Sequence, residues 1–117
     1  MPEIRLVGGM FSLLNDYFKL RDFEEINMRY ITDLWAAKNA FKYHVLSKCP
    51  QYKPIIEFER ERNNHMVQNI IRIVESHPDD SVLIVVGIDH KYYIERELRK
   101  KGIHVLDVEE VIKKWWK

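Results

Sequence analysis

The sequence contains a single cysteine, Cys49, which cannot form a disulfide within the chain or supply the thiolates of a structural zinc site. The fold must therefore depend on packing alone. Hydrophobic residues make up 46% of the chain and charged residues 32%. This balance predicts a soluble globular protein rather than a disordered one.

Neither sign of charge predominates, since 19 Lys and Arg residues face 18 Asp and Glu residues. The chain therefore lacks the positive field that non-specific binding to nucleic acid or to an anionic membrane requires. No apolar run approaches the roughly 18 to 20 residues of a membrane span, and the Met-Pro-Glu start does not resemble a signal peptide. We expect a cytoplasmic protein with no nucleic-acid partner and no membrane partner.

The length of 117 residues favours a single domain over 1–117, because two domains would each have too small a core. We divide it into a helical N-terminal part (1–50) and a core (54–117). In the N-terminal part the pattern predicts an amphipathic helix to about Leu20 and a second helix from near Phe23 to just before Cys49. At roughly 40 Å this second helix is longer than a small core needs. It either covers its own domain or packs partly on another chain.

In residues 54–117 the pattern predicts helices that alternate with short β-branched segments. The predicted elements are a helix over 54–76, a strand over 82–86, a helix over 92–101, a strand over 103–106 and a last helix from 108. This order predicts an α/β fold with a right-handed βαβ crossover and a small parallel sheet, flanked by long amphipathic helices.

Two strands make a thin sheet, since open sheets usually hold about four to six. The segment Ile4–Val7, a second copy of the chain or a missing partner polypeptide could complete it. We therefore expect a homodimer or a missing N-terminal half.

Three polar residues of the third helix, Glu59, Arg62 and Asn63, fall in or beside its apolar stripe. An unpaired buried charge is costly, so Glu59 and Arg62 should pair with each other or border a polar cavity. An ordinary buried ion pair would give the same pattern.

The lengths of neighbouring elements predict where these residues lie. The helix from Arg62 to His77 is about 23 Å long, and the following segment from Val82 to Asp89 runs back in the opposite direction over about 23 Å. Arg62 and Asn63 should therefore lie beside the turn at 87–90, at the edge where open α/β sheets place a ligand crevice.

The candidate site gathers residues from this helix and this turn. Its catalytic candidates are Glu59, Arg62 and His90, and its ligand-binding candidates are Asn63, Gly87 and Asp89. Gly87 would allow close backbone approach, and the start of the next helix would favour an anion. Each signal has a plainer alternative, such as a solvated histidine at His90 or a helix N-cap at Asp89.

Two motifs carry a resemblance to a known family. The run Glu61-Arg62-Asn63-x-x-Met66, the turn Gly87-Ile88-Asp89-His90 and the helix end at 98–102 resemble the C-terminal half of the TraB/Tiki superfamily, whose relatives include erythromycin-esterase-like and haem-binding ChaN-like proteins. The match covers about residues 57–108. The resemblance implies that Arg62, Gly87 and His90 belong to an active or ligand-binding cavity, and some branches of the superfamily are described as hydrolases or metal-dependent proteases.

The family has two halves, and residues 1–50 lack the second Gly-x-x-His pattern. Our first hypothesis is therefore a non-catalytic or incomplete half-domain that oligomerises or binds a ligand. The alternative is an ester or peptide hydrolase completed by a second chain, with His90 as general base or as ligand to a divalent metal, Arg62 at the oxyanion and Glu59 or Asp89 orienting the histidine. One histidine with one or two carboxylates is fewer ligands than a catalytic metal needs.

Overall fold

The computed structural model describes residues 23–115, and every regular element in this part of the chain is a helix. In chain order the elements are α2 (Phe23–Ile26), α3 (Arg29–Leu46), the 3-10 turn η1 (Pro50–Tyr52), α4 (Lys53–Ser76), α5 (Ile88–Lys100) and α6 (Val108–Trp115). The segment Ile4–Val7 and the predicted helix before Leu20 lie outside the described residues.

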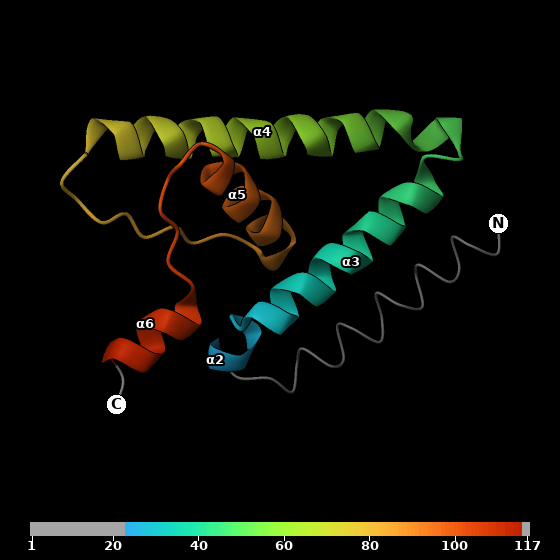
Figure 1. Ribbon diagram of the computed structural model, residues 1–117. Helices are drawn as coiled ribbons and strands as arrows, with labels where there is room; N and C mark the ends of the chain where they lie inside the picture. The colour runs from blue at the N-terminus through green and yellow to red at the C-terminus, as the bar shows by residue number, and fades with distance from the viewer. Residues whose placement is uncertain (1–22, 116–117) are drawn as a thin grey trace.

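Three helices form the body of the molecule. The long helix α4 runs straight, α3 leaves one of its ends obliquely, and α5 lies in the angle between them (Figure 1). The short helix α6 follows α5 and lies close to the start of α3 (Figure 1). The body therefore holds α5 between two longer helices, and α6 sits at its margin.

The main apolar core lies where α5 meets α4. Val67, Ile94 and Leu98 are almost fully buried there. The partly buried side chains packed against them are Met66, Ile70, Ile71, Ile84, Val86, Tyr93, Ile103 and Val105. On α3, Ile31 and Trp35 are buried as well, so α5 has apolar neighbours on more than one side.

The predicted α/β fold with a parallel sheet is wrong for the described residues, which contain no strand. In residues 82–86, Ile84 and Val86 pack on the core, but Leu83 and Val85 are 88% and 87% exposed rather than buried. The backbone groups of this segment bond to no other described residue. A strand needs a neighbouring chain segment about 4.8 Å away to take its hydrogen bonds. The β-branched composition indicates an extended apolar segment but not whether a neighbour exists.

The predicted helix boundaries in the core agree with the structure to within a few residues. Pro54 lies in the first turn of α4, where it removes no helical hydrogen bond, and the helix ends at Ser76 as predicted. At the end of α5, Gly102 has φ +79°, and the N–H groups of Gly102 and Ile103 bond back to the carbonyls of Arg99 and Leu98. This is a Schellman ending, and it closes the helix at Lys100, within one residue of the predicted end.

Two helices have boundaries that differ from the sequence-based prediction. The predicted helix from Phe23 is interrupted at Met28, whose backbone is extended, so that α2 and α3 are separate. Helix α5 begins at Ile88, four residues before the prediction, because the extended residue Gly87 is its N-cap. Between residues 23 and 115 no helix combines the length and apolar character needed to cross a membrane.

Candidate functional site

Asn63 on α4 and His90 on α5 meet directly; the length argument placed both Arg62 and Asn63 beside this turn, and of these two only Asn63 bonds to it. The Nδ1 atom of His90 lies 2.6 Å from the Oδ1 atom of Asn63, and both side chains are partly buried. Because the Asn63 side-chain oxygen can only accept, Nδ1 of His90 is the donor in this contact.

Asp89 is held by three donors from α3. Its Oδ1 atom accepts hydrogen bonds from the indole N–H of Trp35, from Lys38 Nζ at 3.2 Å and from Asn39 Nδ2 at 3.4 Å. Partial burial tends to raise the pKa of the Asp89 carboxyl, but these bonds and the Lys38 charge together lower it below its ordinary value. Asp89 lies in the first turn of α5 and is not its N-cap.

Lys38 is the most deeply buried cation of this region, with a side chain only 2% exposed. Its ammonium group lies 3.9 Å from the centre of the Trp35 ring, besides its ion pair with Asp89. Burial lowers the pKa of Lys38 even though the Asp89 charge acts in the opposite direction. The pair therefore ties α3 to the start of α5.

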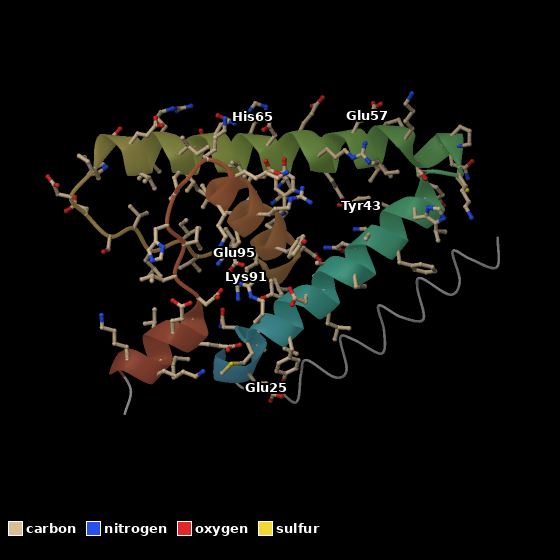
Figure 2. All side chains as sticks on the ribbon, viewed as in Figure 1. Glu25, Tyr43, Glu57, His65, Lys91 and Glu95 are labelled. Carbon is tan, nitrogen blue, oxygen red and sulfur yellow. The ribbon has the colours of Figure 1, made fainter. Side chains whose placement is uncertain are left out.

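Glu59 pairs with α3 rather than with Arg62. It accepts a hydrogen bond from the Tyr43 hydroxyl and lies 3.5 Å from Lys42 Nζ. Figure 2 shows Tyr43 in the space between α3 and α4. Burial, and then the bond to Glu59, raise the pKa of Tyr43 well above its ordinary value. Arg62 is exposed and makes no hydrogen bond or ion pair with any described residue.

Gly87 does not provide the close backbone approach expected of it. Its φ of −64° is available to any residue, and an added Cβ would lie 3.8 Å from the His90 ring, which is an ordinary contact. His65 of α4 is exposed and does not join these residues by any hydrogen bond among the described part of the chain.

These contacts form what we call the junction cluster, which comprises Asp89, Glu59, His90 and their partners on α3 and α4. Its carboxylates are occupied by donors from α3, so it joins three helices. Among residues 23–115 no three His, Cys, Asp or Glu side chains gather closely enough to hold a metal ion. The geometry suits a structural polar junction better than a metal centre.

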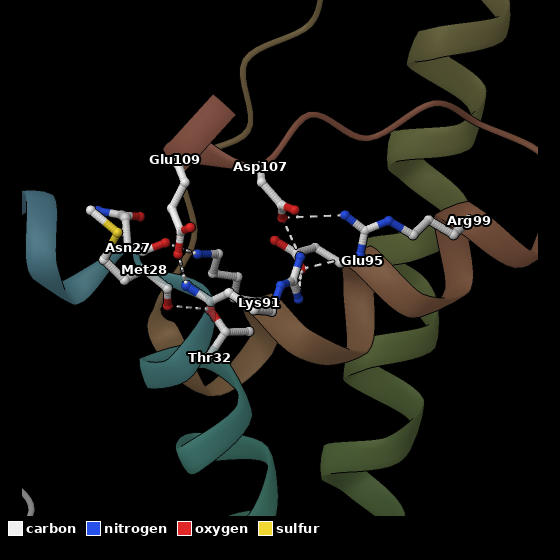
Figure 3. Close-up of polar contacts among 9 residues, drawn as sticks. Asn27, Met28, Thr32, Lys91, Glu95, Arg99, Asp107 and Glu109 are labelled. Atoms are coloured by element: carbon white, nitrogen blue, oxygen red, sulfur yellow. Dashed lines mark hydrogen bonds and ion pairs between the residues drawn. The ribbon is translucent and has the colours of Figure 1, made fainter. Parts of the chain in front are cut away.

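A second polar group, which the sequence reasoning missed, surrounds Arg29 at the start of α3. We call it the Arg29 cluster, and its members are Arg29, Lys91, Glu95, Arg99, Asp107 and Glu109 (Figure 3). Glu95 is buried to all but 8% of its surface and binds Arg29 at 3.0 Å and Arg99 at 3.5 Å. Only the Glu95–Arg99 spacing of four residues is visible in the sequence.

Glu109 supplies the cap that α3 lacks locally. The N-cap residue Met28 has no side-chain oxygen to offer, and Glu109 Oε1 accepts the backbone N–H of Arg29 at 2.6 Å. Burial tends to lower the pKa of Arg29, but the charges of Glu95 and Asp107 outweigh it and raise the pKa. Two cavities, of about 650 and 420 Å³, border this cluster.

Comparison with known proteins identified no relative: no family model, no curated protein and no solved structure matches the chain. The resemblance to the TraB/Tiki superfamily therefore stays a prediction.

Proposed function

We propose that this chain is a non-catalytic domain that associates with a second copy of itself. The observation that carries the proposal is the exposed apolar surface of residues 82–86, which we call the apolar segment. Leu83 and Val85 are almost completely exposed, and Val82 is 38% exposed. Contiguous exposed apolar side chains commonly mark a protein interface.

The chemistry of the apolar segment favours a second copy as its occupant. The run Ser81-Val82-Leu83-Ile84-Val85-Val86-Gly87-Ile88 contains no charge. Two copies can therefore bring the same surface together about a two-fold axis without like-charge repulsion. The backbone groups of residues 82–86, which have no partner among the described residues, would also be available to the incoming copy.

The hydrogen-bond partners of the candidate catalytic residues support the proposal that the domain is non-catalytic. Glu59 and Asp89, the two candidate carboxylates, are bonded to buried or partly buried donors of α3, and Arg62 lies outside their reach. The hydrolase alternative needs a second catalytic group near His90, but Asn63 is the only described residue that bonds to its ring. We therefore place the hydrolase second.

Two predictions from the sequence belong to this proposal. A homodimer is one of the two arrangements expected from the sequence, the other being a missing N-terminal half. A cytoplasmic location would suit a chain with one cysteine, and that cysteine is buried.

Sedimentation or light scattering across the micromolar range tests the proposal. The expected particle has twice the 14.2 kDa mass of the chain. The double variant Leu83→Asp/Val85→Asp should be monomeric with unchanged helical circular dichroism. The control Phe58→Asp, at a residue of α4 that is 64% exposed, should still dimerise. A parent that remains monomeric at all concentrations overturns the proposal, as does a control that dissociates like the double variant.

A further inference from the structure

Two guanidinium groups converge on one carboxylate oxygen in the Arg29 cluster. The Nη2 atoms of both Arg29 and Arg99 bond to Oδ1 of Asp107, the second at 3.3 Å (Figure 3). On the other side, Glu95 Oε2 binds both arginines. Glu95 thus holds the two guanidinium groups in place from within the body, independently of Asp107.

A cavity of about 650 Å³ opens beside this convergence. It is lined by Arg29 and Arg99, by Asp107 and Glu110, and by residues 102–105. The two arginines belong to the body, on α3 and α5, whereas both lining carboxylates belong to α6 or to the residue just before it. It is therefore an open surface hollow, in which two cations of the body face two carboxylates of the C-terminal element.

The same division of charge extends beyond the cavity wall. Glu109 of α6 accepts the first N–H of α3, a position at which helices bind anions. Lys91 of α5 lies close enough to Asp107 and Glu109 for their negative charges to act on its ammonium group. Asp107 and Glu109 thus both contact donors of the body that a multiply charged anion could contact in their place.

We propose that this cavity binds a small phosphate-bearing molecule, whose phosphate replaces Asp107 between Arg29 and Arg99 and thereby releases α6. A phosphate group carries about −1.5 to −2 charges and three acceptor oxygens, whereas Asp107 presents one oxygen to both arginines. Planar guanidinium groups bind phosphate in a forked geometry. Asp107 acts as an internal competitor for the site.

Release of α6 follows from its attachment. Asp107 immediately precedes α6, and Glu109 lies in its first turn, so the polar contacts that hold the start of the helix belong to those that the phosphate replaces. Glu110, which would repel the ligand, leaves with the same helix. Ligand binding and α6 detachment should therefore be coupled, each favouring the other.

Calorimetric titration of the full chain with pyrophosphate and with inorganic phosphate, against chloride at equal ionic strength, tests the site. Asp107→Asn removes the competing charge, and we expect it to bind pyrophosphate about five- to tenfold more tightly than the parent. Arg99→Gln should lose most of the binding. Arg96→Gln is the matched control, because Arg96 lies on the same helix, pairs with Glu97 and does not line this cavity.

Hydrogen exchange gives a second readout. Pyrophosphate should increase amide exchange within residues 108–115, and chloride at the same ionic strength should not. If Arg99→Gln does not fold, Arg99→Lys keeps the charge without the fork and should bind more weakly than the parent. The proposal fails if phosphates act no differently from chloride, if Asp107→Asn leaves the affinity unchanged, or if Arg96→Gln weakens binding as much as Arg99→Gln.

Discussion

The junction cluster and the Arg29 cluster use similar residue types but hold different parts of the molecule. The junction cluster joins α3 to α4 and α5, three helices that also share apolar contacts. The Arg29 cluster joins this body to α6 through Asp107 and Glu109. Ion pairs that accompany apolar packing reinforce an existing interface, whereas the contacts of Asp107 and Glu109 hold the start of a short helix at the margin of the body. The second cluster is therefore the better place for a ligand to act.

The largest effect is expected at Glu95, the buried carboxylate of the Arg29 cluster. Glu95→Gln keeps the size of the side chain but removes the charge shared by Arg29 and Arg99, and we expect it to lower the free energy of unfolding by about 1.5 to 3 kcal/mol. Urea denaturation followed by circular dichroism measures this. The control Glu57→Gln removes an exposed ion pair with Lys53 and should cost less than about 0.5 kcal/mol. Equal effects of the two variants would show that Glu95 is not a buried anchor.

A smaller effect, visible in its pH dependence, is expected at Asp89 of the junction cluster. Because the pKa of Asp89 is lowered in the folded state, the folded chain binds a proton there less readily than the unfolded chain. The carboxylate therefore stabilises the fold above its unfolded pKa of about 3.9, and this contribution is lost as the pH falls through the lower, folded value.

The comparison of the parent with Asp89→Asn isolates that contribution. The parent should be more stable than the variant at neutral pH, and the difference in unfolding free energy should shrink once the pH falls below about 4. Denaturation curves at a series of pH values measure it. A difference that stays constant over this series would mean that the contacts with Trp35 and Lys38 do not depend on the Asp89 charge.

The smallest effect is expected at Arg62. The buried ion pair that the sequence suggested would cost about 3 to 5 kcal/mol when broken. In the structure Glu59 is bonded to Tyr43 and Lys42, and Arg62 is exposed. Arg62→Ala should therefore change the unfolding free energy by less than about 0.5 kcal/mol. If Arg62→Ala instead lost several kcal/mol of unfolding free energy in the same assay, the result would support the buried Glu59–Arg62 ion pair predicted from the sequence.

Some features of the structure could be predicted from residues that are close in the sequence, and others could not. The ends of α4 and α5 could be predicted because Pro54 and Gly102 act within one helical turn. The meeting of Asn63 with His90 followed from the lengths of two segments joined by a short turn. The direction of Glu59 could not be predicted, because its partners lie on α3 and the angle between α3 and α4 is set by packing.

The two extended segments show why strand-like composition is not enough to predict a sheet. Residues 82–86 and 103–106 have the composition of strands and alternate side chains inward and outward, yet they form no ladder within residues 23–115. Alternation and β-branching describe one segment at a time, whereas a sheet is a relation between two segments. The sequence therefore indicated their conformation but not their pairing.

The amino-acid sequence alone determined where the helices of the core lie, because caps, prolines and apolar periodicity act over a few neighbouring residues. Only the tertiary structure decided which charges meet, since Arg29 joins Glu95 and Asp107 across 66 and 78 residues of chain. Such contacts depend on the angles at which helices pack, and those angles arise from the summed shape of many side chains rather than from any local signal.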